Sequence, residues 1–265
     1  DTKKMVFIVD HNVPSDCPKT AASQKKMRDF AKENNIDYWE GKGVCHQVMM
    51  EHYVCPGELI FGADSHTCSY GALGAFGTGV GCTDLLYGMV TGKSWVLVPE
   101  TVKFNLVGKL PEGVYARDLI LTIIGTIGAN GCNYQVMEFT GEGAKTLSIS
   151  ERMVLCNMAV EAGAKTGIFE PDEKAIEYLE AHGRKPKALF TSDPDAVYAR
   201  EYTFDLSKIR PVVAKPDFVD NLVPAEEVRG VKIDEAFLGS CNNGRIEDLR
   251  VGASIIKGKK VAEKV

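Results

Sequence analysis

Short apolar runs alternate with amphipathic segments along the chain, and this alternation limits its fold more than any other feature. Runs typical of buried strands lie at 5–9, 59–62, 95–98, 102–107, 135–140, 202–206 and 233–238. Segments with helical apolar spacing lie at 20–34, 82–90, 116–127, 148–162 and 245–256. Ser148 and Glu151 match a capping box at the start of one of these helices. Such β–α alternation predicts an α/β fold with reactive groups at the ends of strands.

Two changes in this pattern divide the chain. One lies near Pro99, after which a fresh alternating strand begins, and the other lies near Tyr202, beyond a polar stretch at 183–194 that contains proline. A chain of 265 residues is long enough for more than one domain. We therefore expect domains at 1–99, 100–201 and 202–265.

Composition and charge exclude several classes of function. Hydrophobic residues make up 45% of the chain, which supports a packed core. The net charge of -5 and the pI near 5.6 disfavour a nucleic-acid-binding surface. No apolar run approaches the roughly 20 residues needed to cross a bilayer. The chain begins Asp-Thr-Lys-Lys, without a signal peptide, so we expect a cytoplasmic protein with no membrane or nucleic-acid partner.

The chain has eight cysteines, and no two of them have C-x-x-C spacing. The absence of this spacing argues against a zinc ribbon or a thioredoxin-type motif. A disulfide framework is not expected in a chain with a core of this size and no secretion signal. Most of the thiols are therefore expected to be small buried hydrophobes. Cys241 differs because it follows an expected strand, in the string G-S-C-N-N-G-R. A loop of this kind suits an iron–sulfur ligand, although a plain turn cysteine explains the residue better when it is taken alone.

Two acidic–histidine groups follow expected strands. Asp64, Ser65 and His66 place a carboxylate, a hydroxyl and an imidazole in consecutive positions, as general acid–base chemistry requires. Asp10 stands beside His11, and a neighbouring carboxylate raises the pKa of an imidazole, so this histidine could donate a proton near neutrality. A loop histidine beside a helix-capping aspartate is the alternative.

Two further polar residues are less specific. His46 alone is more often a hydrogen-bonded core histidine than a functional one. Glu138 lies on an apolar strand, where an unpartnered carboxylate is costly to bury. This indicates either a polar cavity or a position on an edge strand.

Glycines at 71, 74, 77, 79 and 81 resemble a nucleotide-binding loop. They do not form G-x-G-x-x-G, and no Gly-Lys-Ser/Thr follows them. Close backbone packing around residues 64–66 explains them better than phosphate binding.

Several rare strings occur in one order along nearly the whole chain. They are D-H-N-V-P, G-V-C-H-Q, G-A-D-S-H-T, V-P-E-T, C-N-M-A-V-E-A-G-A-K-T-G and G-S-C-N-N-G-R. The chain thereby resembles large subunits of the aconitase superfamily, most closely in its isopropylmalate/homoaconitate branch. The resemblance implies aconitase-like α/β/α domains with a cleft between them. It also implies a hydro-lyase that dehydrates and rehydrates hydroxy di- or tricarboxylates with a [4Fe-4S] cluster.

The resemblance carries roles to individual residues. Cys241 resembles a cluster ligand, and His11, oriented by Asp10, resembles the group that protonates the departing hydroxyl. Ser65 resembles a contact to a substrate carboxylate. The residues that resemble the network around the iron-bound water are His46, Asp64, His66 and Glu138. The base that removes the carbon-bound proton is implied to be a serine of a separate small subunit.

The chain departs from the family pattern in three ways. No G-C-x-x-C-type segment with the other two cluster cysteines occurs before Val265, and the leading segment before D-H-N-V-P is missing. Asn242 stands where the family usually has threonine. Because one cysteine cannot hold this cluster, we expect the chain to be part of a longer polypeptide and inactive by itself.

Two other functions are compatible with the sequence. One is a zinc or mononuclear-metal hydrolase that uses His46, His66 and Cys68. Another is a cluster-free assembly module that keeps the fold. The substrate also stays open among isopropylmalate, homocitrate, dimethylmalate and citraconate.

Overall fold

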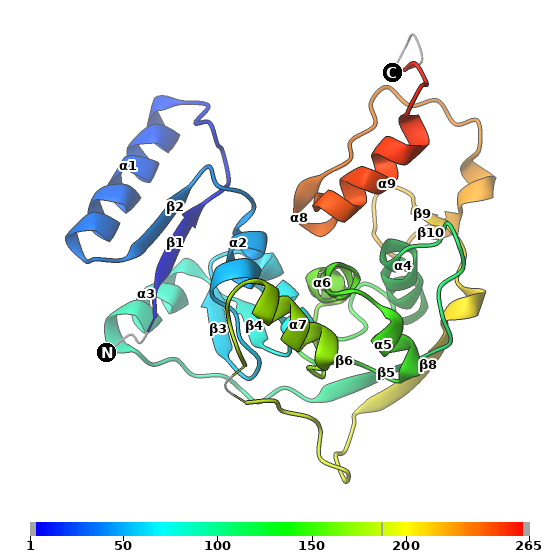
Figure 1. Cartoon of the computed structure of the whole chain (residues 1–265), viewed down its shortest axis with the longest axis horizontal. Helices are drawn as coiled ribbons and strands as arrows, with labels where there is room; N and C mark the ends of the chain where they lie inside the picture. Colours follow the sequence, from blue (N-terminus) through cyan, green and yellow to red (C-terminus); the bar gives the residue numbers. More distant parts are fainter. Residues whose placement is uncertain (1–3, 187, 262–265) are drawn as a thin grey trace.

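The computed structural model describes residues 4–186 and 188–261. Residues 1–3, 187 and 262–265, which include the outer ends of the first and third expected domains, lie outside the described residues. The described part combines helices with mostly parallel strands, so the expected α/β fold is confirmed (Figure 1).

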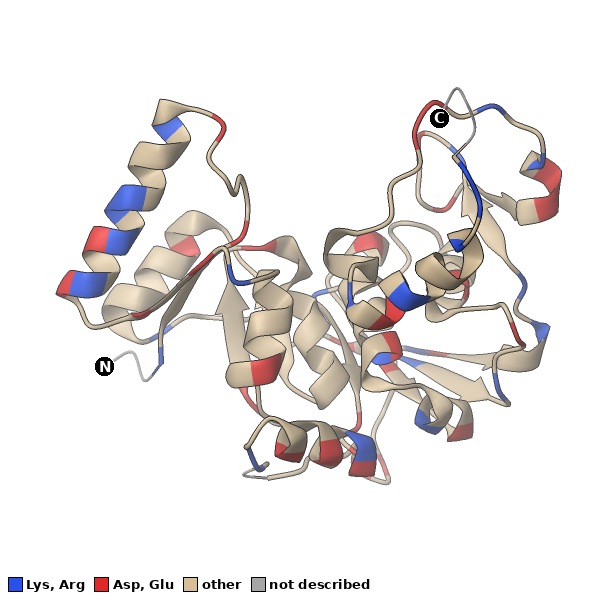
Figure 2. Ribbon diagram, turned by 45° about the horizontal axis from the view of Figure 1, so that its top comes forward, with Lys and Arg blue, Asp and Glu red and all other residues tan. Residues whose placement is uncertain are grey.

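The first part of the chain carries two small parallel sheets. Its elements are β1 (Val6–Val9), α1 (Pro18–Glu33), β2 (Asp37–Glu40), α2 (Cys45–His52), β3 (Leu59–Gly62), the 3-10 helix η1 (Ser65–Leu73), β4 (Phe76–Gly79) and α3 (Cys82–Thr91). Strand β1 pairs with β2, and β3 pairs with β4. In Figure 1, α1, β1 and β2 form the arm at the left, and basic and acidic residues are intermixed along α1 (Figure 2).

A four-stranded parallel sheet lies at the centre of the rest of the chain. Its strands β5 (Thr101–Val107), β6 (Val136–Thr140), β7 (Thr166–Phe169) and β8 (Arg200–Asp205) lie in the order β7-β6-β5-β8. In β5 every second side chain is buried, namely Val102, Phe104 and Leu106, as strand periodicity requires. The ring of Phe104 packs against that of Phe139 on β6, with centroids 5.6 Å apart.

Helices cover this sheet, and short elements follow it. The helices are α4 (Ala116–Ile127), α5 (Glu142–Thr146), α6 (Ile149–Asn157), the 3-10 helix η2 (Met158–Ala162) and α7 (Glu173–Ala181). The chain continues with η3 (Leu206–Lys208), the antiparallel pair β9 (Val212–Ala214) and β10 (Leu222–Pro224), η4 (Ala225–Val228), α8 (Ser240–Asn243) and α9 (Ile246–Ile256). Helix α8 contacts α6, which brings the segment around residue 241 back to the centre of the molecule (Figure 1).

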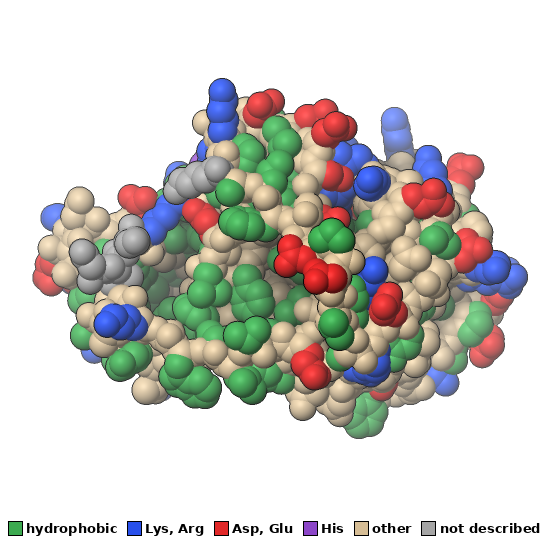
Figure 3. All heavy atoms as spheres, turned by 90° about the horizontal axis from the view of Figure 1, so that it is seen from below, with side chains coloured by type: hydrophobic (Ala, Val, Ile, Leu, Met, Phe, Trp, Pro, Cys, Tyr) green, Lys and Arg blue, Asp and Glu red, His purple; other side chains and the backbone are tan. Residues whose placement is uncertain are grey.

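Two expected strands are absent from the described residues. Segments 95–98 and 233–238 are irregular, and their apolar side chains are exposed: Trp95 by 80%, Val98 by 86% and Phe237 by 79%. An apolar run becomes a strand only where a neighbouring strand accepts its backbone hydrogen bonds, and neither segment has one. Hydrophobic side chains gather on the face seen in Figure 3.

The expected helix over 148–162 is divided. Its capping box is confirmed, because Ser148 and Glu151 each bond the backbone N–H of the other. The regular α-helix ends at Asn157, and the tighter helix η2 continues to Ala162. The next residue, Gly163, has a φ of 77°, which ends the helical backbone.

The sequence patterns missed strands β2, β4 and β7. These have four residues each, like the expected strands β1 and β3, but polar residues or glycine interrupt them, whereas β1 and β3 are nearly continuous apolar runs. Strand β8, expected to open the third domain, pairs with β5 in the central sheet. The division into three domains stays a prediction.

The glycine run packs backbone against backbone. A Cβ on Gly71 would lie 1.7 Å from the carbonyl oxygen of Gly167 on β7, and one on Gly77 would lie 2.3 Å from that of Thr67. Helix η1 therefore lies against β4 and β7 at distances that only glycine allows, as the packing interpretation expected. None of the described helices has both the length and the apolar character needed to span a membrane.

An ion pair between the buried Arg152 on α6 and the partly buried Asp172 links α6 to the start of α7. The side chain of Arg152 is 1% exposed, and its Nη1 and Nη2 donate to the two carboxylate oxygens of Asp172 at 2.8 and 2.5 Å. Burial raises the pKa of Asp172, but the hydrogen bonds and charge of Arg152 outweigh that effect and hold the pKa below its ordinary value.

We predict that Asp172→Asn lowers the free energy of unfolding by about 3 kcal/mol, because it leaves a buried guanidinium without its counter-charge. The control is Glu40→Gln, which breaks the exposed Arg28–Glu40 pair and should cost less than about 1 kcal/mol. The native contribution of Asp172 is present above the carboxyl's unfolded pKa and is lost as pH falls through its lower folded pKa. In urea unfolding, the free energies of unfolding of the native chain and of Asp172→Asn should therefore converge in acid. An equal loss of free energy of unfolding in Asp172→Asn and Glu40→Gln at pH 7 would contradict the prediction.

Candidate active site

The expected acid–base groups lie at the ends of parallel strands. Asp10 directly follows β1, and Asp64 lies two residues beyond β3. Helix α2, which the sequence analysis did not anticipate, presents His46 from its first turn. The Asp64 carboxylate also caps η1 by accepting the N–H of His66 at 2.7 Å, so the backbone fixes its position.

Asp64 is the meeting point of three histidines. His46 Nε2 lies 3.0 Å and His66 Nδ1 3.6 Å from Oδ1, and His11 Nε2 lies 3.5 Å from Oδ2. The hydrogen bond with His46, followed by that with His66, holds the pKa of Asp64 well below its usual range. Because His46 is 1% exposed and its Nδ1 lies 3.3 Å from the hydroxyl of Tyr70, its ring is fixed on both sides.

Asp10 and His11 form the expected pair. His11 Nδ1 lies 2.8 Å from Asp10 Oδ1, and the hydrogen bond raises the pKa of His11. The other oxygen of Asp10 accepts the backbone N–H of Cys45 at 2.6 Å, at the start of α2. Asp10 therefore both orients His11 and stabilises the helix that carries His46. The side chain of His11 is 73% exposed, so its second nitrogen is accessible.

The sulfur of Cys241 lies beside this group. One ligand atom each of His46, His66 and Cys241 lies within 4.8 Å of the others. Burial raises the pKa of Cys241, but hydrogen bonds from His66 and Asn157 outweigh it and lower the pKa to about 7. The bonds to Asp64, Cys241 and Glu161 raise the pKa of His66 to about 12. The resting site thus favours a thiolate beside an imidazolium.

Asn242 is part of a chain of amides that holds Cys241. Its Nδ2 donates to Asn157 Oδ1 at 3.0 Å, and Asn157 Nδ2 in turn donates to the sulfur of Cys241 at 3.5 Å. The guanidinium of Arg117 donates to Asn242 Oδ1, which fixes the orientation of that amide. Asn242 and Asn157 are both buried. At the position where threonine is usual, the Asn242 side chain thus has hydrogen-bond partners for both its oxygen and its nitrogen.

Sequence reasoning missed Asn157 and Glu161. Glu161 Oε1 lies 3.7 Å from His66 Nε2, and this contact lowers the pKa of the glutamate. Both residues occur in the string C-N-M-A-V-E, four positions apart, a spacing that would share one face of the α-helix expected over 148–162. In the structure the α-helix ends at Asn157, and the packing of η2 against η1 brings Glu161 to His66.

Glu138 lies elsewhere. Its carboxylate accepts from the hydroxyls of Ser192 and Tyr198, both at 3.0 Å, and among the described residues none of its hydrogen-bond partners belongs to the histidine group. Glu138 is on strand β6, which lies between β5 and β7, so the edge-strand alternative is wrong. A polar environment, the other alternative, explains how this carboxylate is tolerated.

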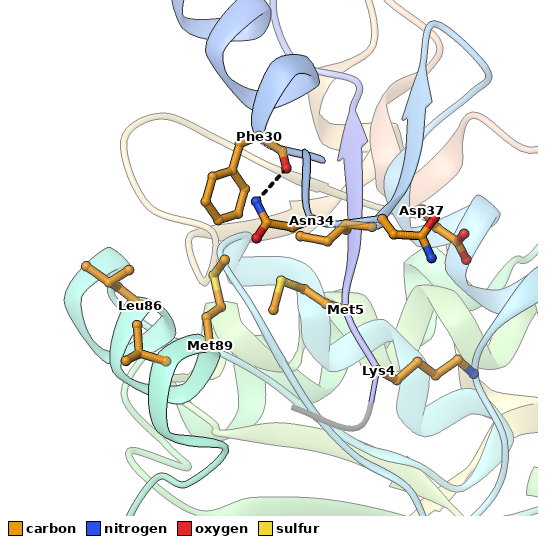
Figure 4. A pocket seen from close by; sticks show the side chains of 10 residues that line it. Lys4, Met5, Phe30, Asn34, Asp37, Leu86 and Met89 are labelled. Carbon is orange, nitrogen blue, oxygen red and sulfur yellow. Dashed lines mark hydrogen bonds between the residues drawn. The ribbon is translucent and has the colours of Figure 1, made fainter. Parts of the chain in front are cut away.

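The remaining expected residues are also placed. Ser65 is exposed beside the group, with its Oγ 3.3 Å from His66 Nδ1. Cys68 is buried and donates to the carbonyl oxygen of Asn157 at 3.3 Å. The cysteine that lies beside His46 and His66 is Cys241, not Cys68 as the mononuclear-metal hypothesis expected. A separate pocket between α1 and α3, lined by Met5, Phe30, Leu86 and Met89 among others, contains none of the expected site residues (Figure 4).

We predict that Cys241 of the metal-free chain reacts with iodoacetamide at a rate that is half-maximal near pH 7, because its thiolate is stabilised there. His66→Gln should move the midpoint to higher pH, since it removes the hydrogen bond and the positive charge. Cys82→Ser, which changes an exposed thiol outside the group, should leave the midpoint in place. The measurement is alkylation followed by mass spectrometry. An unchanged midpoint in His66→Gln would overturn this account of the thiolate.

Comparison with known proteins gives a consistent result. The model of the aconitase family (aconitate hydratase) matches residues 2–229. A 3-isopropylmalate dehydratase large subunit of Methanopyrus kandleri is 48% identical over 268 residues, which cover 100% of this chain and 64% of that protein. One from Hydrogenobaculum sp. is 50% identical, over 98% of this chain and 62% of that protein.

A probable methanogen homoaconitase large subunit of Methanothermobacter thermautotrophicus is 47% identical, over 100% of this chain and 63% of that protein. The chain thus spans less than two thirds of the length of these curated relatives. The family match covers most of the chain and all the candidate residues but one, Cys241, which the alignment to the relatives includes. The chain belongs to the aconitase family.

Proposed function

We propose that this chain is the part of a hydro-lyase large subunit that carries its proton-transfer groups and one ligand of an iron–sulfur cluster. The observation that carries the proposal is the convergence of three histidines on Asp64, next to the sulfur of Cys241. The substrate would be a hydroxy di- or tricarboxylate. The first candidate activity is that of 3-isopropylmalate dehydratase, a step of leucine biosynthesis, because relatives of that name are about 50% identical.

The donor atoms fit one corner of a [4Fe-4S] cluster. A cluster is held by thiolates, and the surroundings of Cys241 favour its thiolate near neutral pH. Among the described residues this is the cysteine whose sulfur lies with the histidines, so the other two thiolates would come from the length that the relatives have in addition. When bound, the cluster supplies a Lewis-acidic iron for the hydroxyl and carboxylate of the substrate.

The proton of the departing hydroxyl would come from His11. Asp10 raises the pKa of this imidazole, and the ring is exposed. A protonated, accessible imidazole is suited to act as a general acid. Asp64 Oδ2, 3.5 Å from Nε2, would keep the ring aimed at the site.

The other groups would hold the substrate and the water. Ser65 offers an exposed hydroxyl to a substrate carboxylate. His46, Asp64 and His66 would orient a water molecule through their shared bonds. Glu161, which contacts His66, would take the role that the resemblance gave to Glu138.

A small subunit would complete the enzyme and supply the base that removes the carbon-bound proton. The relatives are named large subunits, which supports such a partner. Homoaconitase is the second candidate activity, because one relative carries that name. Dimethylmalate and citraconate would be tested beside isopropylmalate and homocitrate.

We predict that the longest natural form of this polypeptide, reconstituted anaerobically, binds about four irons and four sulfides. Cys241→Ser should abolish the cluster's EPR signal, whereas Cys82→Ser, which changes an exposed thiol, should retain it. Absence of sulfide from a verified full-length polypeptide would reject the proposal and favour the cluster-free assembly module.

We predict that His11→Gln lowers kcat of the cluster-loaded complex by about 10²–10⁴-fold without changing the cluster signal, because the proton donor is lost. Asp10→Asn should move the alkaline limb of the kcat profile to lower pH, since the carboxylate keeps His11 protonated to higher pH. His182→Gln, on an exposed histidine that bonds the Tyr178 carbonyl, is the matched control. An unchanged rate in His11→Gln would exclude it as the proton donor.

A further inference from the structure

We propose that His46, His66 and Cys241 form a site for a single divalent ion of the zinc class, which is filled when no iron–sulfur cluster is present. The proposal does not rest on the hydro-lyase activity. It starts from the three ligand atoms, which lie within 4.8 Å of one another. One thiolate and two imidazoles are a donor set that zinc and cobalt prefer over magnesium or calcium.

The required movement is small. Bonds of about 2.0–2.3 Å to one tetrahedral ion place the ligand atoms roughly 3.5 Å apart. His46 is buried and fixed, but the side chain of His66 is 27% exposed and Cys241 lies on the four-residue helix α8. Closure would therefore come from side-chain movement of His66 and Cys241 towards His46.

Neighbouring residues already orient the ligands. Asp64 Oδ1 lies 3.0 Å from His46 and 3.6 Å from His66. These contacts use His46 Nε2 and His66 Nδ1, and His46 Nδ1 lies 3.3 Å from the hydroxyl of Tyr70. An ion bound at either nitrogen of His46 would displace one of these two contacts, and the other would still orient the ring. Asn157 donates to the sulfur of Cys241 from the other side. Each of the three ligands thus has a partner outside the set.

The charges around the site favour a dication. Asp64 Oδ1 lies 3.0 Å from His46 and 3.6 Å from His66, and Glu161 Oε1 lies 3.7 Å from His66 Nε2. A dication held by the two histidines and the sulfur would interact favourably with both carboxylates, one of which also contacts His11. Three protein ligands leave the fourth position of a tetrahedral ion open to water.

The ion and the cluster would exclude each other, because both need the sulfur of Cys241. Mononuclear binding is therefore a property of the chain before or without cluster assembly. It can be tested with no iron and no sulfide present, so its failure and the failure of the proposed hydro-lyase function are distinguishable.

The test is a titration of the metal-free chain with Co²⁺ under argon, as a spectroscopic substitute for Zn²⁺. We expect one equivalent to bind with a sulfur-to-cobalt charge-transfer band and the intense visible bands of a four-coordinate ion, which one equivalent of Zn²⁺ bleaches. Cys241→Ser should abolish the charge-transfer band. Asp64→Asn should weaken Co²⁺ binding by about tenfold, because it removes the carboxylate that contacts both imidazoles.

Cys82→Ser is the matched control, since it changes an exposed thiol outside the set and should leave the spectrum unchanged. A second measurement needs no variant: Zn²⁺ should protect Cys241 of the unsubstituted chain from alkylation. A charge-transfer band that persists in Cys241→Ser, a spectrum of six-coordinate Co²⁺, or alkylation of Cys241 at an unchanged rate would overturn the proposal.

Discussion

The site depends on the contacts that the Asp64 carboxylate makes with three histidines. This carboxylate accepts the N–H that begins η1, and the same oxygen bonds His46 from α2. The close packing of Gly77 and Gly79 against residues 64–67 holds the backbone that carries it. Fold and site are thus connected through one side chain. Any change that moves the end of β3 would also disturb the histidines, because all three rings contact this carboxylate.

The sequence predicted the parts of the fold in which periodicity is strong. Strand β5 and helix α4 carry enough residues to show their periods, and both lie where expected. Segments 95–98 and 233–238 are apolar but unpaired, because pairing depends on distant chain that a local pattern does not describe. Strands β2, β4 and β7 were missed for the opposite reason, since pairing with β1, β3 and β6 forms them although their own residues do not make an apolar run.

The site was predictable where a residue follows a strand and not where two helices must meet. Asp10 and Asp64 follow β1 and β3, and the rule for parallel sheets located them. The sequence interpretation placed Glu138, a carboxylate on an apolar strand, in the site and did not consider Glu161. Only the packing of η2 against η1 determines which glutamate contacts His66, and sequence spacing contains no information about that contact.

Asn242 illustrates how a departure from a family pattern can be absorbed. A threonine offers one hydroxyl, whereas the amide of Asn242 both donates to Asn157 and accepts from Arg117. The longer side chain therefore spans two partners and leaves Asn157 free to donate to the sulfur of Cys241. An amide chain of this kind stabilises a thiolate whatever metal it will hold. The identity of the proposed metal would then depend on how many further thiolates reach the site, because two imidazoles favour a single ion and added thiolates favour a cluster.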